Sequence, residues 1–133
     1  MEDIVIVGSG GFAKEVEFLI KEINKKEKKW NFLGFIGSFK EGDSQVFKND
    51  EWLESINKKI NVAFGIGSPD LIEKLYCKFC LNNNIQFPNL IHPNVTADWE
   101  KIKLGVGNII CASNTFTTDI NIGNCNIVNL DCT

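Results

Sequence analysis

The stretch LGVGNIICASNTFTTDINIGNCNIVNLDCT, residues 104–133, repeats every six residues and decides the second half of the fold. Lone large apolar side chains return at this interval, separated mostly by Gly, Asn, Asp, Thr, Ser and Cys; they are Leu104, Ile110, Phe116, Ile122 and Val128. Neither an α-helix nor a half-buried strand has this period. A solenoid of short strands does, because each strand turns one side chain inward before the chain turns a corner. The period therefore predicts a hexapeptide β-helix.

The six-residue spacing is broken once, upstream of this stretch. Ile91 and Ala97 are six residues apart, whereas Leu104 follows Ala97 by seven. This predicts one inserted residue at a corner of the first coil, within residues 99–103. Pro88 and Pro93 lie where the solenoid pattern begins.

Residues 1–88 have a different pattern. The β-branched run Asp3–Val7 ends in glycines, and apolar residues at helical spacing follow, as in a buried parallel strand that leads into an amphipathic helix. Ser68 and Pro69 are typical of the start of a second long helix. We further expect strands at 32–36, 60–66 and 85–87, a polar loop at 37–49, and a short helix at 50–56. The buried face of the second long helix is expected to be Leu71, Ile72, Leu75, Tyr76 and Phe79.

These signals predict an α/β Rossmann-like N-terminal domain with a short parallel sheet at residues 1–88. Residues 89–133 are expected to form an incomplete hexapeptide-repeat β-helix.

The composition is that of a soluble globular protein, with 44% hydrophobic and 23% charged residues, a net charge of -3 and a pI of about 5.2. This balance argues against nucleic-acid binding, which requires a basic face. No apolar run is long enough to span a membrane and no signal peptide precedes the first strand, so we expect a cytoplasmic protein without membrane contact. The chain contains no Arg, so a phosphate must be bound by Lys or by backbone N–H groups.

Five cysteines and one histidine offer little metal or nucleophile chemistry. Without a secretion signal, an odd cysteine count favours reduced thiols. Cys77 and Cys80 form a C-x-x-C within a predicted helix, where packing on a helix face is a better interpretation than zinc or redox chemistry. His92 is expected to be a hydrogen-bonded structural residue. No metal site is predicted.

The segment Gly8-Ser9-Gly10-Gly11-Phe12-Ala13 fits the pattern G-x-G-x-x-G/A between a strand and a helix. Glycines allow a ligand to approach the backbone, and the helix N-terminus attracts anions. A dinucleotide site would also need Asp or Glu at the end of the second strand, where this chain has Gly37 and Ser38. A nucleotide sugar is therefore favoured over a nicotinamide cofactor. The alternative is a tight turn that binds no ligand.

Three motifs together carry a family resemblance: I-V-I-V-G-S-G-G-F-A-K-E-V at residues 4–16, L-G-F-I at 33–36 and I-H-P at 91–93, followed by the hexapeptides. The chain resembles bacterial sugar acetyltransferases, namely the sialic acid O-acetyltransferases and the N-acetyltransferases of UDP-4-amino sugars. The resemblance implies a left-handed parallel β-helix that trimerises and binds acetyl-CoA between neighbouring subunits. It also implies that the N-terminal domain binds the sugar acceptor, often as a UDP-sugar.

The resemblance assigns the following residues to the acceptor site: Gly8, Ser9, Gly10 and Gly11, with Gly65, Gly67 and Ser68 nearby. Family members often have His in place of Phe12 and commonly Asp in place of Gly37 and Ser38, so the nucleotide contacts there are expected to differ. Asn129 matches an Asn that helps position the acceptor and precedes the catalytic His. That base is expected just beyond Thr133, so we expect no catalytic residue in this chain, and little or no activity from it alone.

Two other functions fit parts of the sequence. A non-catalytic nucleotide-binding module would use the hexapeptides only for assembly. An NAD-dependent oxidoreductase fragment would rest on the glycine loop alone.

Overall fold

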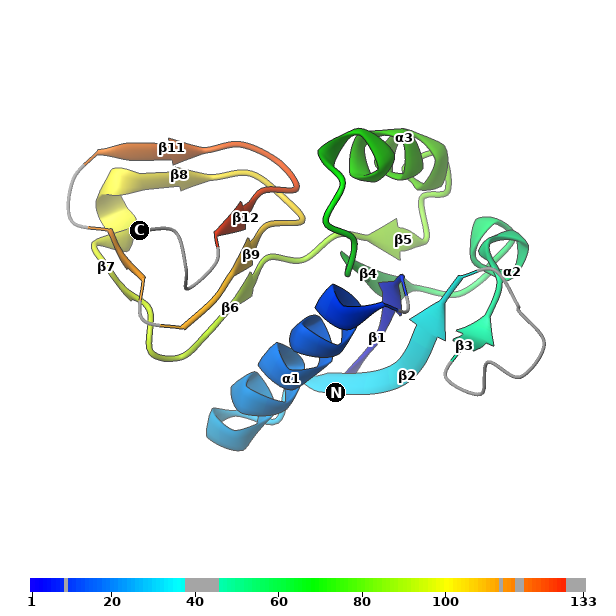
Figure 1. Cartoon of the computed structure of the whole chain (residues 1–133), viewed down its shortest axis with the longest axis horizontal. Helices are drawn as coiled ribbons and strands as arrows, with labels where there is room; N and C mark the ends of the chain where they lie inside the picture. Colours follow the sequence, from blue (N-terminus) through cyan, green and yellow to red (C-terminus); the bar gives the residue numbers. More distant parts are fainter. Residues whose placement is uncertain (9, 38–45, 113, 117–118, 129–133) are drawn as a thin grey trace.

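The computed structural model describes residues 1–8, 10–37, 46–112, 114–116 and 119–128. A sheet flanked by helices forms one part of the molecule, and a triangular coil of short strands forms the other (Figure 1).

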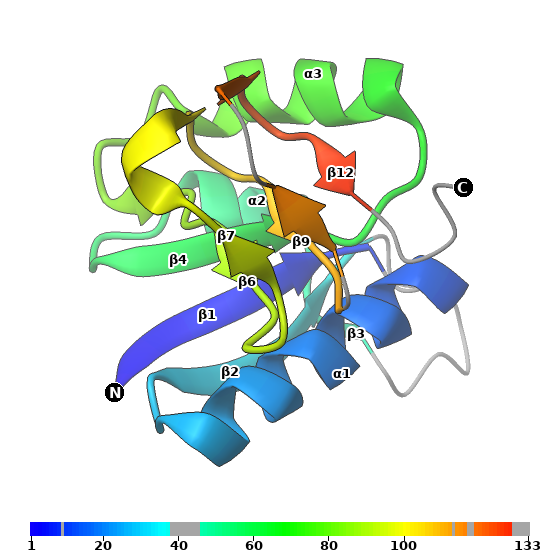
Figure 2. The ribbon, with the colours of Figure 1, turned by 90° about the vertical axis from the view of Figure 1, so that its left-hand side faces the viewer.

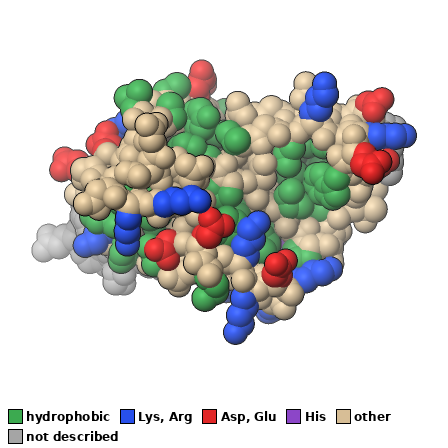
Figure 3. Space-filling view, turned by 180° about the vertical axis from the view of Figure 1, so that it is seen from behind, with side chains coloured by type: hydrophobic (Ala, Val, Ile, Leu, Met, Phe, Trp, Pro, Cys, Tyr) green, Lys and Arg blue, Asp and Glu red, His purple; other side chains and the backbone are tan. Residues whose placement is uncertain are grey.

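None of the helices in the described residues is long and apolar enough to cross a bilayer. On the face shown in Figure 3, lysine and acidic side chains are intermingled, so this face has no extended basic region.

The first part contains a five-stranded, all-parallel sheet in the order β3-β2-β1-β4-β5. Its strands are β1 (Glu2–Val7), β2 (Trp30–Ile36), β3 (Val46–Lys48), β4 (Ile60–Phe64) and β5 (Ile85–Gln86). Its helices are α1 (Gly11–Lys26), α2 (Asp50–Glu54) and α3 (Pro69–Phe79). The predicted parallel-sheet α/β architecture is thereby confirmed.

Strand β1 contributes side chains to the cores on both faces of the sheet, because successive side chains on a strand point to opposite sides. Ile4 and Ile6 belong to the core beneath α1, whereas Val5 and Val7 belong to the core shared with α2 and α3. All four are 0–2% exposed, as expected for the central strand of a parallel sheet that is covered on both faces.

Two details of this part differ from the sequence-based expectation. The predicted loop 37–49 contains the edge strand β3, which pairs with the end of β2. The predicted buried face of α3 is correct for Ile72 and Phe79, but Leu71 is 42% exposed. Leu71 lies in the first turn of α3, next to the buried Ile72, on the exposed side of the helix.

The second part winds in turns around a triangle, and each side of the triangle is a small parallel sheet (Figure 1). Its strands are β6 (Leu90–Ile91), β7 (Thr96–Ala97), β8 (Ile102–Leu104), β9 (Ile109–Ile110), β10 (Thr115–Phe116), β11 (Ile120–Ile122) and β12 (Ile127–Val128). One side is β6-β9-β12, the second is β7-β10 and the third is β8-β11. Of the six-residue anchors, Ile110 and Ile122 are buried, while Leu104, Phe116 and Val128 are partly buried.

The predicted corner insertion is confirmed by the strand register. Thr96 pairs with Thr115 and Ile102 pairs with Ile120, so the first of these two steps along the chain is longer by a single residue. The extra residue of the first turn therefore lies between β7 and β8, where the chain forms the 3-10 helix η1 (Trp99–Lys101). One turn of 3-10 helix absorbs the insertion without disturbing the strands on either side.

Asparagine side chains tie successive turns together at one corner. The Asn89 side-chain oxygen accepts from the backbone N–H and the side-chain amide of Asn108, at 2.9 and 3.0 Å. The Asn108 oxygen in turn accepts from the backbone N–H of Asn126 at 2.7 Å. The amides of Asn89 and Asn108 donate to the carbonyls of Gly105 and Gly123, each at 2.7 Å. This asparagine ladder replaces strand pairing at a corner, where backbone groups would otherwise lack partners.

A common core joins the two parts. Leu90 and Ile109, on the β6-β9-β12 side of the coil, are 0% and 2% exposed and pack in the same cluster as α1 (Figure 2). On the other side of the sheet, Cys125 and Ile127 pack against the cluster that contains α3. The coil therefore sits against both long helices.

Candidate functional site

The carboxyl ends of β1 and β4 meet at a point of very close packing. Gly8 has a φ of +119°, and a Cβ atom there would lie 2.6 Å from the Gly65 carbonyl oxygen. A Cβ on Gly65 would lie 2.6 Å from the Cα of Ala13, in the first turn of α1. Only glycine fits at these two positions. Gly8 and Gly65 thus bring the ends of two neighbouring strands against the start of α1.

The other glycines of the loop border open space. A Cβ on Gly10, Gly11 or Gly67 would meet no atom of the described residues within 4 Å, apart from its chain neighbours. Packing among the described residues therefore does not require glycine at these three positions, and glycine there leaves the backbone open to a bound molecule.

The N-termini of the two long helices differ in their capacity for an anion. Helix α3 has an N-cap, because the Ser68 hydroxyl accepts from the Leu71 N–H at 3.4 Å, and it carries Asp70 in its first turn. Helix α1 begins after Gly10, which has no side chain to cap it, and has no acidic residue in its first turn. The first N–H groups of a helix have no acceptor within the helix, and the helix dipole adds positive potential. The start of α1 is therefore the better anion site.

A cavity of about 520 Å³ opens beside the start of α1. Its walls come from three segments far apart in the sequence: the starts of α1 and α3, and the third turn of the coil. They are Phe12, Gly67, Pro69, Ile72, Cys125, Asn126 and Ile127. An adjoining hollow of about 430 Å³ shares four of these residues and extends along α3 to Tyr76 and Cys77. Because ligands of such sheets bind beyond the carboxyl ends of the strands, this cavity is the candidate site.

Cys125 places its side chain in both hollows and has an unusual backbone conformation. Its φ of 56° is in the left-handed region, and its N–H donates to the Val106 carbonyl at 2.8 Å. Burial raises the pKa of the Cys125 thiol, so the thiol stays protonated at neutral pH. A protonated thiol is a poor nucleophile, and Cys125 is therefore a wall of the cavity rather than a reactive group.

The predicted acceptor residues divide into three groups. Phe12 and Gly67 line the cavity, and Gly10 and Gly11 lie next to Phe12 at the start of α1. Gly8, Gly65 and Ser68 do not line the cavity: the two glycines allow the close packing of β1, β4 and α1, and Ser68 caps α3. Gly37 lies at the end of β2, where its N–H donates to the Lys48 carbonyl at 3.1 Å, and it does not line the cavity. Ser9, Ser38 and Asn129 lie outside the described residues.

Sequence reasoning missed the far wall of the cavity. Pro69 and Ile72 follow directly from the predicted helix start, but Cys125, Asn126 and Ile127 reach the glycine loop only through the docking of the coil onto α1 and α3. No local signal in residues 125–127 indicates that contact.

The remaining titratable candidates are structural. The Nδ1 atom of His92 accepts from the Asn94 N–H at 3.0 Å, as expected for a structural histidine. Cys77 and Cys80 are both exposed, so the expectation that they pack on a helix face is wrong; the Cys80 thiol instead donates to the Cys77 carbonyl at 3.3 Å. Within the described residues, no group of three or more His, Cys, Asp or Glu side chains could hold a metal ion.

Known proteins share this architecture, as comparisons of sequence and of structure show. The sequence model of the PglD N-terminal domain matches residues 3–79, more than half of the chain. A search of the curated proteins found no match.

Solved structures share the fold over nearly the whole chain. A mutant of perosamine N-acetyltransferase from Caulobacter crescentus, solved with CoA and GDP-perosamine, has a TM-score of 0.78 and 23% identity over 97% of this chain and 60% of its own. The acetyltransferase domain of PglB from Neisseria gonorrhoeae has a TM-score of 0.76 and 19% identity over 97% and 62%. Its complex with acetyl coenzyme A has a TM-score of 0.63 and 17% identity over 95% and 66%. The chain thus spans less than two thirds of the length of the first two proteins.

Proposed function

Because the chain belongs to the family of the PglD N-terminal domain, we propose that it is the acceptor-binding part, with the start of the transfer part, of an acetyl-CoA-dependent sugar acetyltransferase. The acceptor would be a nucleotide-linked sugar, acetylated on an amine or a hydroxyl. The observation that carries the proposal is the cavity at the uncapped start of α1, lined there by Phe12 and Gly67, with Gly10 and Gly11 directly before Phe12 in the chain.

The diphosphate of the acceptor is the group that this site suits best. With no Arg in the chain, the backbone N–H groups at the start of α1 supply the donors, and the absence of a first-turn acid leaves their positive potential uncancelled. Phe12, Ile72 and Ile127 provide apolar walls for the rest of the ligand. Gly37, where dinucleotide sites have an acid for the ribose, disfavours NAD.

The triangular turns would be the first coils of a left-handed parallel β-helix built from hexapeptide repeats. Its parallel sides support this, as does a register in which each strand pairs with the strand three hexapeptides further along the chain. In this proposal residues 1–88 form the acceptor domain and residues 89–133 the β-helical part. By resemblance to the sugar acetyltransferases, the protein would be a homotrimer that binds acetyl-CoA between subunits.

The proposed reaction requires a base. The acceptor nitrogen or oxygen attacks the thioester carbon of acetyl-CoA, the carbon–sulfur bond breaks, CoA leaves as the thiol, and the base removes the proton of the acceptor. His92 and Cys125 do not suit this role, since His92 uses Nδ1 to accept from Asn94 and the Cys125 thiol is held protonated. The family resemblance assigns the base to a His that would follow Asn129.

Calorimetric titration tests the acceptor site directly. We expect UDP- or GDP-linked amino sugars to bind and NADH not to bind. Gly67→Phe, at a cavity-lining position, and Gly10→Phe, at the N-cap of α1 two residues before the lining Phe12, should each weaken binding at least tenfold, because a Cβ at either position meets no atom of the described residues within 4 Å and the new ring can occupy the space left for the ligand. Leu81→Phe, at a position 84% exposed beyond the end of α3, is the matched control. Unchanged affinity in both glycine variants, or tight NADH binding by the wild type, would refute the proposal.

A further inference from the structure

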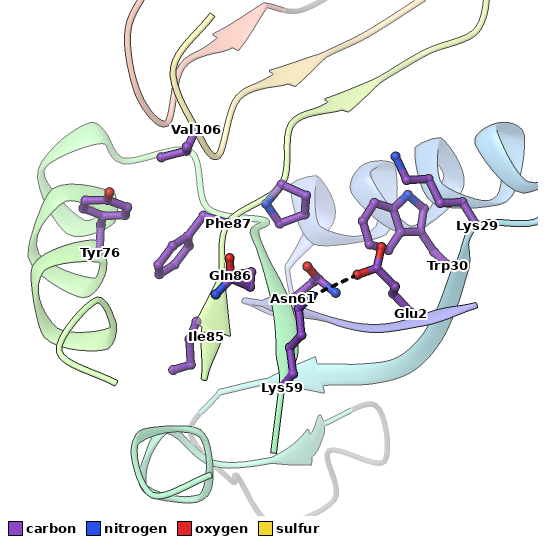
Figure 4. Close-up of a pocket in the computed structure, with 11 residues that line it drawn as sticks. Glu2, Lys29, Trp30, Lys59, Asn61, Tyr76, Ile85, Gln86, Phe87 and Val106 are labelled. Carbon is purple, nitrogen blue, oxygen red and sulfur yellow. Dashed lines mark ion pairs between the residues drawn. The ribbon is translucent and has the colours of Figure 1, made fainter. Parts of the chain in front are cut away.

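A second groove lies at the opposite edge of the sheet from the glycine loop, where the strands begin (Figure 4). Its volume is about 410 Å³, at the small end of the range for ligand sites. Glu2 at the start of β1, Trp30 at the start of β2 and Ile85 at the start of β5 contribute to it. The other wall is formed by the segment that joins the two parts and by Val106, at a corner of the coil.

Aromatic side chains gather at one end of this groove. The rings of Tyr76 and Phe87 are 4.8 Å apart, and Phe87 stacks on Phe64 at 5.7 Å with an interplanar angle of 12°. This stacking holds the Phe87 ring in place. Val106 is 41% exposed and lies beside these rings in Figure 4. Together they form an apolar end that accepts a flat ring.

Two lysines lie away from this aromatic end, Lys59 beside Asn61 and Lys29 beyond the Trp30 ring (Figure 4). Lys59 pairs with Glu2 at 3.7 Å, with the two side chains 69% and 50% exposed. The Lys29 ammonium lies 5.1 Å from the centre of the Trp30 ring. An exposed ion pair of this length contributes little to stability, so a stronger anion can displace Glu2 from Lys59.

Amide side chains occupy the middle of the groove: Gln86 lies next to Phe87, and Asn61 lies beside Lys59 and Glu2 (Figure 4). Asn61 is 5% exposed, and its amide nitrogen donates to the Asp3 carbonyl at 2.9 Å, which fixes the orientation of the side chain. Gln86, the neighbouring amide, is exposed. Amides both donate and accept hydrogen bonds, and they therefore suit sugar hydroxyls or the polar edge of a heterocycle.

We propose that this groove binds a small aromatic anion of mononucleotide type. Its ring would lie against Tyr76 and Phe87, and its polar middle beside Asn61. Its phosphate would pair with Lys59 in place of Glu2, and Lys29, beyond the Trp30 ring, would add positive potential. Such a ligand would contact both the sheet and the corner of the coil at Val106. The groove shares no lining residue with the 520 Å³ glycine-loop cavity, although Tyr76 also borders the adjoining hollow along α3. The proposal does not depend on the proposed acetyl transfer.

The test is a titration of the Gly67→Phe variant, in which the glycine-loop cavity is filled, with AMP, UMP, adenosine and ribose 5-phosphate. Binding is followed by calorimetry and by Trp fluorescence, since Trp30 lines the groove. We expect saturable binding of AMP or UMP, and at least tenfold weaker binding of ribose 5-phosphate and of adenosine. Lys29→Gln combined with Lys59→Gln should weaken the nucleotide at least tenfold, whereas Lys74→Gln, an exposed lysine of α3 outside the groove, should not.

One substitution should strengthen binding. Glu2→Gln removes the carboxylate that competes for Lys59, and the nucleotide should bind severalfold more tightly. A second measurement uses the wild-type chain: AMP should protect Lys29 and Lys59, but not Lys74, from acetylation by an N-hydroxysuccinimide ester, as read by mass spectrometry. Absence of saturable nucleotide binding to Gly67→Phe together with absence of protection in the wild type would overturn the proposal. Equal binding of ribose 5-phosphate and AMP would also overturn it.

Discussion

Replacing Asn108 by Ala tests whether the asparagine ladder holds the turns of the coil together. Asn108 is 0% exposed, and its side chain makes three hydrogen bonds: from the Asn126 N–H at 2.7 Å, to the Asn89 side-chain oxygen at 3.0 Å, and to the Gly123 carbonyl at 2.7 Å. At about 1 kcal/mol for each hydrogen bond, the loss amounts to about 3 kcal/mol. That is a large fraction of the roughly 5–15 kcal/mol that stabilises a typical domain.

The assay is urea unfolding of the whole chain, followed by far-UV circular dichroism and Trp fluorescence. Asn121→Ala is the matched control, because Asn121 is exposed on β11; it should change the free energy of unfolding by less than about 0.5 kcal/mol. Asn108→Leu restores the lost volume without the hydrogen bonds, and it should remain destabilised by about 2 kcal/mol or more.

An isosteric substitution gives the sharpest version of this test. Asn108→Asp keeps the acceptor for Asn126 but turns the donor toward Asn89 and Gly123 into an acceptor, so it should destabilise at neutral pH at least as much as Ala. Burial and the facing oxygens would raise the pKa of this carboxyl, so part of the stability should return as the pH falls and the protonated acid donates again. An Asn108→Ala variant as stable as Asn121→Ala would refute the role assigned to the ladder.

Two further predictions concern the walls of the candidate site. Gly8→Ala should lower the free energy of unfolding in urea by about 2–4 kcal/mol, because φ is +119° and the new Cβ would lie 2.6 Å from the Gly65 carbonyl oxygen. Gly10→Ala is the control: its φ is -83° and a Cβ there meets no described atom within 4 Å, so the free energy of unfolding should change by less than about 0.5 kcal/mol. Equal effects of the two substitutions would contradict the packing described. Iodoacetamide should modify Cys125 more slowly than the exposed Cys77 at pH 7.5, and the rate at Cys125 should keep rising at higher pH, because burial raises the pKa of the Cys125 thiol. Peptide mapping by mass spectrometry measures both rates. A faster reaction at Cys125 than at Cys77 would show that the Cys125 thiol is not shielded.

Much of the fold could be predicted because it is encoded locally. The run Asp3–Val7, its glycines and the apolar stripe after them specify a strand, a turn and a helix in contiguous residues. The change from six to seven residues after Ala97 located the 3-10 insertion at the correct corner. The resemblance to sugar acetyltransferases drawn from these motifs is confirmed at the level of the family.

The features that were missed depend on distant partners. Strand β3 is three residues long, and it is a strand only because the edge of β2 is available to pair with it. Gly34 could have indicated the presence of β3, because a glycine within a strand often marks the close approach of another backbone. Its φ is +145°, and a Cβ there would lie 2.5 Å from the Cβ of Phe47 in β3. The role of Asn108 was equally hidden, because its partners lie one turn of the coil away in the chain.

The candidate site was half predicted for the same reason. Motif reasoning identified the glycine loop and the turn after β4, which supply Phe12 and Gly67 to the near wall. The far wall depends on the packing of Leu90 and Ile109 in the same core as α1, a contact between residues more than sixty positions apart that no local pattern encodes.

The core shared by the sheet domain and the coil also has an energetic consequence for opening of the cavity. Opening the cavity by a hinge at Pro88 would pull Leu90 and Ile109 out of their contact with α1, at a cost of roughly 3–6 kcal/mol for the two side chains. Separation of the coil from α1 is therefore costly, and the two walls of the cavity are held together without a ligand. If the cavity binds the proposed acceptor, selection among acceptors would depend on the fit of the ligand to walls that are already in place, and little ordering entropy would be lost on binding.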